Sequence, residues 1–318
     1  MKRYVIAIGG NALEEKKNSL PEIFRQIAGC IAHLIEKGDS IAIVFGNGPQ
    51  VGKLVMQNHY ASKEIEENTI DECVAMTQAL IGYQLEKELG NALLSYGIKR
   101  NIVNVITQVV VDEQELAHAK PTKPIGAAYS KEEADRLCRE RPGIVFKEDS
   151  LRGWRRVVVS PKPLRIREIE TIRALLEQEN IVIAGGGGGI PVIEKADKEY
   201  LGVDAVIDKD YTAERIAEDV EADVLVLLTG VEYVAIHYGM ENQQNLKEIS
   251  SDEMKQYEAD GEFSEGSMLP KVKAALKFAE SKIGRKAVIG TLEKLDGILN
   301  GDSGTRITGA EVICGRNG

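Results

Sequence analysis

The sequence has little cysteine and no long apolar run, and each shortage excludes a class of protein. Its four cysteines, Cys30, Cys73, Cys138 and Cys314, share no short spacing, so neither a zinc site nor a CxxC redox motif is expected. We therefore predict a reduced, cytoplasmic protein. The first apolar run stops at Gly9, which is too short for a signal-peptide core or a membrane span.

Positive charge is outnumbered by negative charge. The chain has 40 Lys plus Arg against 50 Asp plus Glu, a formal net charge of -10. This balance argues against a general electrostatic affinity for nucleic acid or for an acidic membrane. Any anionic ligand must therefore be held by a few local groups.

The usual motifs of nucleophilic and nucleotide chemistry are missing. There is no Gly-x-Ser-x-Gly turn, and the four histidines are scattered along the chain. The segment Gly46 to Gly52 places its third glycine one position too late for a dinucleotide turn, which disfavours a nicotinamide dehydrogenase. It also fails as a P-loop, because Leu54 stands where Ser or Thr would bind magnesium.

What the sequence does have is glycine placed directly after apolar runs. Five glycines, Gly185 to Gly189, follow the β-branched run Ile181 to Ala184. This pattern predicts a buried strand that leads into a loop where a partner approaches the backbone closely. Exposed N–H groups in such a turn bind anions, phosphate among them. A flexible turn between two strands fits the run equally well, and the glycines alone leave both interpretations open.

Apolar strands alternate with amphipathic helices along the whole chain. We predict strands near 1–8, 41–45, 101–111, 181–184 and 224–228, and helices near 20–37, 69–94, 165–179, from 208 and after 267. Such alternation predicts an α/β fold around a mainly parallel sheet, with ligands bound beyond the carboxyl ends of the strands. Gly9-Gly10, Gly46-x-Gly48 and the five-glycine run all fall at such ends. In the helix near 69–94, Cys73 and Met76 are predicted core residues.

The chain is long enough for two lobes. We predict an N-terminal lobe at 1–178 and a C-terminal lobe at 179–318. From about 116 to 163 the composition changes, with the proline-rich segment Pro121 to Gly126 and the basic segment Arg152 to Arg156. This change predicts a small inserted subdomain. Its prolines hold Lys123 in a stiff loop, as a lid would require. A solvated lysine on a surface hairpin is the alternative.

Two further lysines stand at predicted helix starts, where the helix dipole disfavours a cation. They are Lys209, between Asp208 and Asp210, and Lys271. A bound phosphate chain would reverse that penalty. The two aspartates either cap the helix or orient Lys209 and a metal-bound phosphate. Phosphoryl transfer suits these groups, because it requires positioning and charge stabilisation rather than a covalent partner.

Six segments resemble motifs of the carbamate kinases, in the amino-acid kinase family, in the same order and over essentially the whole chain. The segments are Gly9 to Leu13, Gly46 to Gly52, Pro121 to Gly126, Gly153 to Val158, Ile207 to Asp210 and Gly266 to Val272.

The resemblance implies a three-layer αβα sandwich that forms a homodimer and interconverts carbamoyl phosphate plus ADP with carbamate plus ATP. The catabolic, ATP-forming direction, as in arginine metabolism, is expected. Lys123, Lys209, Asp210 and Lys271 would be catalytic, with Asp210 orienting the lysines. The substrate and the transferring phosphoryl group would be bound by Gly9, Gly10, Asn11, Gly46, Asn47, Gly48 and Gln50. The nucleotide would be bound by Gly186, Gly187, Gly188, Thr229 and Met268. Mg²⁺ would accompany ATP or ADP, held mainly by phosphate oxygens and water rather than by protein ligands.

Some positions depart from the family pattern. Val44-Phe45 replace a Thr-His pair, Lys120 replaces Asn, and Ala127-Ala128 replace Pro-Phe. A Thr-Asp-Val-Asp segment reads Thr229 to Glu232, and a nearby aromatic is Ala235. The loss of an Asp and of the aromatic is expected to alter nucleotide affinity more than phosphate chemistry, and the changes beside Lys123 are expected to affect substrate choice. Two alternatives stay open, another small-acid kinase of the same fold and a non-catalytic nucleotide-binding homologue.

Overall fold

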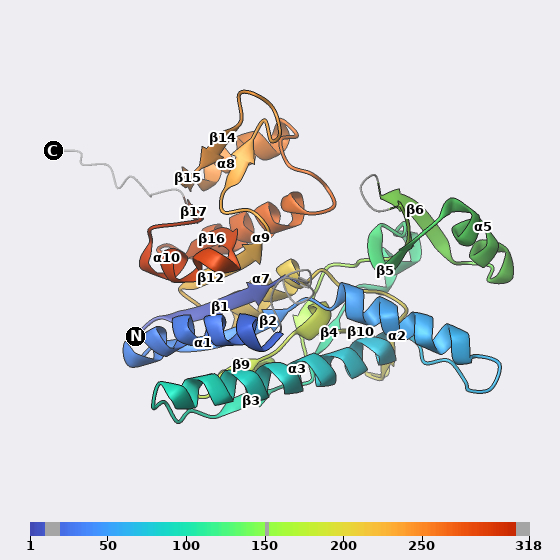
Figure 1. Ribbon diagram of the computed structural model, residues 1–318, viewed down its shortest axis with the longest axis horizontal. Helices are drawn as coiled ribbons and strands as arrows, with labels where there is room; N and C mark the ends of the chain where they lie inside the picture. The colour runs from blue at the N-terminus through green and yellow to red at the C-terminus, as the bar shows by residue number, and fades with distance from the viewer. Residues whose placement is uncertain (10–19, 150–152, 310–318) are drawn as a thin grey trace.

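The computed structural model describes residues 1–9, 20–149 and 153–309, and its centre is one eight-stranded sheet (Figure 1). Across the sheet the strands are β15 (Glu248–Ser250), β17 (Thr305–Thr308), β16 (Lys286–Thr291), β12 (Val224–Thr229), β1 (Arg3–Ile8), β2 (Ser40–Phe45), β9 (Ile181–Ile183) and β3 (Ile102–Asn104). Within the described residues, every neighbouring pair is parallel except β16 and β17. The predicted mainly parallel sheet is confirmed.

Side chains alternate between the two faces of this sheet, and each face is covered by helices. On β1, Val5 and Ala7 enter one apolar cluster, with α6 (Ile169–Glu177), α7 (Lys209–Asp219) and α9 (Met268–Ser281). Ile6 and Ile8 enter the other cluster, with α1 (Leu20–Glu36), α3 (Ile70–Ser95) and α10 (Leu295–Asn300). A strand buried on both faces reads as a continuous apolar run, as this one does. The three-layer αβα sandwich is therefore confirmed.

Smaller sheets lie beside the central one. One has the order β11 (Tyr200–Gly202), β10 (Ile190–Glu194), β4 (Gln108–Val110) and β8 (Arg165–Ile166), and a hairpin joins β13 (Val234–Ile236) to β14 (Gln244–Leu246). The remaining α-helices are α2 (Gly48–Ala61), α4 (Glu113–His118), α5 (Lys131–Glu140) and α8 (Ser251–Ala259). In the described parts of the chain, no helix has the length and apolar character needed to cross a bilayer.

The prediction of one strand over 101–111 is wrong. The segment forms β3 in the central sheet and β4 in the neighbouring sheet, with a break between them. At the break, the buried side chain of Gln78 accepts a hydrogen bond from the N–H of Thr107 at 2.9 Å and donates to its carbonyl at 3.1 Å. Because Gln78 satisfies both backbone groups of Thr107, the chain can leave one sheet and enter another.

The prediction for the apolar side of α3 is half right. Cys73 is fully buried, but Met76 is 42% exposed and is not a core residue. The buried side continues instead through Val74, Gln78 and Ile81 at helical spacing. A polar residue on the buried face thus shifted the apparent apolar stripe.

The predicted insertion contains a separate three-stranded sheet with the order β5 (Lys123–Tyr129), β7 (Gly153–Val158) and β6 (Val145–Asp149), joined by α5. We call residues 123–149 and 153–158 the small subdomain. Figure 1 shows it standing out from the main body beside α2. The division into lobes after residue 178 stays a prediction, because β9 follows that boundary and yet lies between β2 and β3.

Candidate active site

Three predicted site residues lie where neighbouring parallel strands end. Gly9 follows β1, Gly46 follows β2, and Thr229 ends β12. Because these strands are adjacent and parallel, the three residues share one edge of the sheet. The N–H of Gly46 donates to the carbonyl of Ile8 at 2.9 Å. This bond joins two of the glycine corners, the points where a strand ends and glycine follows. The predicted substrate residues Gly10 and Asn11 lie outside the described residues.

The second glycine corner opens helix α2. Asn47 occupies the N-cap position, Gly48 begins the helix, and Gln50 lies in its first turn. The side chain of Asn47 is buried and donates to Thr77 Oγ1 at 2.7 Å, so it fixes the corner against α3 rather than capping its own helix. Among the described residues, the buried Oε1 of Gln50 has no hydrogen-bond partner. An orphaned acceptor of this kind favours a ligand that donates a hydrogen bond.

The five-glycine run forms a tight turn between β9 and β10, and Gly186, Gly187 and Gly188 are buried. A Cβ on Gly187 would lie 2.1 Å from Nδ2 of Asn47, and one on Gly188 would lie 2.2 Å from the carbonyl oxygen of Ile207. Glycine is therefore required for packing at these positions. The turn contacts both the Asn47 corner and the segment that leads into α7. Whether its amides also bind a nucleotide stays a prediction.

Asp210 holds two of the predicted catalytic lysines. Lys209 donates to Oδ1 of Asp210, and Lys271 lies 3.0 Å from Oδ2. Asp210 and Lys209 are both buried in the first turn of α7, while Lys271 comes from the first turn of α9. The carboxylate thus joins the starts of two helices and places two cations side by side.

The pKa shifts in this cluster follow from burial and charge. Burial opposes ionisation of Asp210, but the charges of Lys209 and Lys271 outweigh it, so the pKa of Asp210 falls well below its usual range. Burial lowers the pKa of Lys209, and the neighbouring Lys271 lowers it further. Burial also disfavours the charged form of Lys271, yet Asp210 raises the pKa of Lys271 overall. Asp210 is therefore ionised at neutral pH and stabilises the cations beside it.

Lys123 reaches the same helix start from the small subdomain. Its ammonium group donates to Oδ2 of Asp208, across 85 positions of sequence. The other oxygen of Asp208 accepts from the N–H of Asp210 at 3.1 Å and so caps α7. Capping, one of the two alternatives predicted for the aspartates, is seen for Asp208, while the predicted role of Asp210 in orienting catalytic lysines stays a prediction. The three predicted lysines lie on two carboxylates that are two residues apart.

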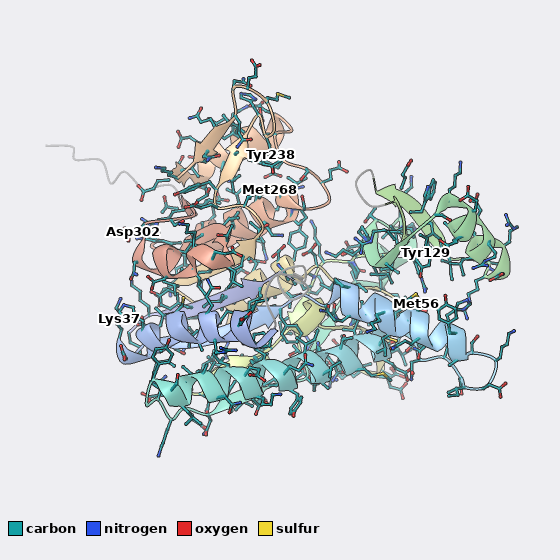
Figure 2. The ribbon with its side chains drawn as sticks, in the orientation of Figure 1. Lys37, Met56, Tyr129, Tyr238, Met268 and Asp302 are labelled. Carbon is teal, nitrogen blue, oxygen red and sulfur yellow. The ribbon has the colours of Figure 1, made fainter. Side chains whose placement is uncertain are left out.

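Thr229 and Met268 are less closely connected to this cluster. Met268 opens α9 one turn before Lys271 and packs against the core (Figure 2). In the described parts of the chain, no side-chain hydrogen bond joins Thr229 or Met268 to the lysines. Their nucleotide role stays a prediction.

The sequence patterns missed Gln78 and Thr212, which hold the glycine turn in place. Gln78 donates to the carbonyl of Gly186 at 2.8 Å, and the hydroxyl of Thr212 donates to the carbonyl of Gly188 at 2.7 Å. A usable signal existed for Gln78, because it continues the spacing of Val74, Ile81 and Leu85 on the buried side of α3. A polar residue at such a position is normally hydrogen-bonded.

Two departures from the family pattern have structural partners. Phe45 is buried against Gly186, where an added Cβ would lie 2.4 Å from the ring. Glu232 accepts a hydrogen bond from the Ser303 hydroxyl at 2.8 Å. Phe45 therefore packs under the glycine turn, and Glu232 links the segment after β12 to the segment before β17.

The class of protein follows from the fold, the cluster of lysines and aspartates, and a match to a known family. The sequence model of the amino acid kinase family matches residues 2–290. The chain belongs to that family. Within it, the chain is similar to proteins named carbamate kinase, which confirms the predicted resemblance. Carbamate kinase 3 of Staphylococcus aureus is 46% identical over 309 residues, covering 96% of this chain and 99% of that protein. A carbamate kinase of Staphylococcus epidermidis is 44% identical over 310 residues, covering 97% of this chain and 100% of that protein.

Solved structures agree with the sequence relatives. Carbamate kinase from Giardia lamblia bound to citric acid is 37% identical with a TM-score of 0.89, covering 97% of this chain and 99% of that chain. The same enzyme bound to AMP-PNP is 37% identical with a TM-score of 0.87 and the same coverage.

Proposed function

We propose that the protein is an ATP-dependent carbamate kinase, which interconverts carbamoyl phosphate plus ADP with carbamate plus ATP. The observation that carries the proposal is the convergence of Lys123, Lys209 and Lys271 on two neighbouring carboxylates. Full-length relatives bearing that name, at 44% and 46% identity, support the choice of reaction.

The lysines suit a migrating phosphoryl group. In the ATP-forming direction, the bond between phosphorus and the carbamate oxygen breaks while a terminal oxygen of ADP forms a new bond to phosphorus. Negative charge is spread over the phosphoryl oxygens in the transition state, and fixed ammonium groups stabilise it without reorganisation. Asp210 holds Lys209 and Lys271 in place before substrate arrives. No covalent intermediate with the protein is required.

The glycine corners and Gln50 suit the acceptor. Gly9 and Gly46 directly follow adjacent strands, and α2 begins beside them at Gly48, where the positive end of the helix dipole favours a small anion. The orphaned Oε1 of Gln50 is an acceptor that the amino group of carbamate would satisfy, whereas acetate has no such donor. Gln50→Leu should therefore narrow the preference for carbamoyl phosphate over acetyl phosphate. An unchanged preference would remove Gln50 from substrate selection.

Magnesium would accompany the nucleotide, and its chemistry there would be to neutralise phosphate charge. The described residues contain no group of three His, Cys, Asp or Glu side chains that could hold a metal ion. Asp208 and Asp210, the carboxylates nearest the lysines, already accept from ammonium groups. Phosphate oxygens and water therefore fit best as the principal magnesium ligands. AMP-PNP bound to the Giardia enzyme supports a nucleotide as the second substrate.

The homodimer and the cytoplasmic location are also proposals. Met76, Leu80 and Tyr83 form an exposed apolar stripe on α3, which supports a subunit contact. Cys30, Cys73 and Cys138 are free thiols, which supports a reducing compartment. Sedimentation of the wild type and of Leu80→Glu tests the contact, since a monomeric wild type would remove it.

A panel of acceptor acids tests the function against its alternatives. With ATP in excess, carbamate should be phosphorylated, and acetate, glutamate and a phosphonate should not. Preference for another acid would identify a different small-acid kinase of the same fold. A non-catalytic homologue would bind ADP in calorimetry and turn over none of the panel.

A further inference from the structure

The tightest glycine contact between the main body and the small subdomain joins Gly52 of α2 to Gly126 of β5. A Cβ on Gly52 would lie 1.8 Å from Cα of Gly126 and 2.0 Å from its nitrogen. Both are backbone atoms, so no rotation of a side chain could relieve the overlap. The helix and the strand can approach this closely only because neither residue has a side chain.

The strand is shaped to make this contact. Gly126 has a φ of +71°, and the pairing of β5 with β7 shifts register between Ile125 and Ala128. A bulge of this kind bends a strand and redirects its backbone. The carbonyl of Gly126 accepts from Nη2 of Arg155 at 2.9 Å, which holds the bulge from the next strand.

A small cavity of about 40 Å³ lies beside the contact, and Val55 and Met56 of α2 and Tyr129 and Phe146 of the small subdomain are among the residues that line it. Figure 2 labels Met56 on α2 and Tyr129 on the small subdomain. Glycine at both positions thus lets the backbones of α2 and β5 touch where the small subdomain packs on α2.

The same strand carries Lys123, three residues before Gly126. Ile125 is buried with Val51 of α2, so the face that β5 turns to the main body is fixed. Directly after β7, Val159 forms an isolated parallel β-bridge with Ala205, three residues before Asp208. The position of the Lys123 ammonium beside Asp208 thus depends on how β5 rests on α2.

We infer that the Gly52–Gly126 contact fixes the small subdomain on α2 and so positions Lys123 for phosphoryl transfer. Gly52 is therefore a positioning residue of this reaction. The inference rests on the proposed function for Lys123. A displacement of about 1 Å in a group that acts on the transition state costs up to about 100-fold in rate.

Gly52→Ala tests the inference. We expect kcat for ATP formation to fall about 10-fold to 100-fold, with KM for ADP changed less than twofold. Gly90→Ala is the matched control, because Gly90 lies inside helix α3 and its added Cβ would make an ordinary contact at 3.7 Å. It should retain wild-type kcat. Wild-type kcat in Gly52→Ala would overturn the inference.

Trp154 gives a second readout that needs no activity. It is the single tryptophan of the chain and lies in β7, paired with Tyr129 of β5. If Gly52→Ala lifts the subdomain, quenching of Trp154 fluorescence by acrylamide should rise, while Gly90→Ala should match the wild type. Unchanged quenching in Gly52→Ala would overturn the inference that the Gly52–Gly126 contact holds the small subdomain on α2. A wild type that forms no ATP would contradict the proposed function. Quenching of Trp154 would still show whether the Gly52–Gly126 contact holds the small subdomain on α2.

Lys123→Ala separates positioning from a general loss of stability. If Gly52 acts through Lys123, adding Gly52→Ala to Lys123→Ala should cost less than twofold in kcat. An undiminished loss in the double variant would overturn the inference. If Gly52→Ala does not fold, Gly126→Ala replaces it, since its Cβ would meet Gly52 Cα at a milder 3.2 Å. Its control is Gly143→Ala, which also has positive φ but meets no atom within 4 Å.

Discussion

Lys271 places its ammonium nitrogen 3.0 Å from Oδ2 of Asp210, although the two residues are 61 positions apart. The other oxygen of the same carboxylate accepts from Lys209. One carboxylate therefore faces two cations at the start of α7, and with Lys123 and Asp208 the cluster holds three lysines against two aspartates in an otherwise acidic chain. Such an excess is costly in an empty site and is relieved by a polyphosphate.

Removing either lysine of this pair should slow ATP formation without abolishing the fold. We expect Lys209→Ala and Lys271→Ala each to lose roughly 3 to 4 kcal/mol of transition-state stabilisation, about 100-fold to 1000-fold in kcat. Steady-state kinetics with carbamoyl phosphate and ADP measures this. Lys37→Ala is the control, since Lys37 is exposed just after α1, away from Met268 (Figure 2). Unchanged kcat in both variants would remove the lysines from the mechanism.

Asp208→Asn should separate helix capping from contact with the small subdomain. Asparagine caps helices about as well as aspartate, so the melting temperature should change little. The ion pair with Lys123 is lost, so Trp154 in the small subdomain should become more accessible to acrylamide. Asp208→Ala, which loses both roles, should also lower the free energy of unfolding by about 1 kcal/mol. Equal stability of the two variants would show that the cap contributes nothing.

Gly188→Ala should destabilise the protein severely. Gly188 has a φ of +90°, and a Cβ there would lie 2.2 Å from the Ile207 carbonyl oxygen. Strain and overlap together should lower the free energy of unfolding by about 3 kcal/mol or more. Gly284→Ala has similar φ but no atom within 4 Å, and should lose only about 1 to 2 kcal/mol. Similar losses in urea melts of the two would contradict the close packing of the turn.

The buried carboxyl of Glu214 should make stability depend on pH. Burial raises its pKa from 4.5 to about 7, although Lys277 donates to Oε2 at 2.8 Å. The folded state therefore binds the proton more tightly than the unfolded state, and stability is lost as pH rises from about 4.5 to about 7.

Glu214→Gln keeps the shape without the charge. Its melting temperature should exceed that of the wild type at pH 8, and the gap should close at pH 5. Glu177→Gln, at an exposed position of α6, should show no such gap. A gap independent of pH would mean that Glu214 does not titrate as described.

Local patterns predicted the layers of the fold, and long-range contacts decided the rest. The unbroken apolar run of β1 was readable because both faces of the strand are buried. Lys209 and Lys271 stood out because a cation at a helix start opposes the local dipole. The split between β3 and β4 could not be predicted from the local sequence, because it depends on Gln78, which lies in helix α3.

The contacts of the small subdomain were equally hidden. The pairing of Lys123 with Asp208 spans 85 positions, and the contact of Gly52 with Gly126 also joins distant segments. No local spacing records such proximity. The outward position of Met76 escaped prediction for a different reason, since Gln78 took the buried place that an apolar residue was expected to fill.

The rate at which the purified protein forms ATP from carbamoyl phosphate and ADP tests the central claim most directly. A coupled assay should show turnover in the wild type, and Lys209→Ala should retain at most about one hundredth of it. Absence of ATP formation by a folded wild type that binds ADP would contradict the account.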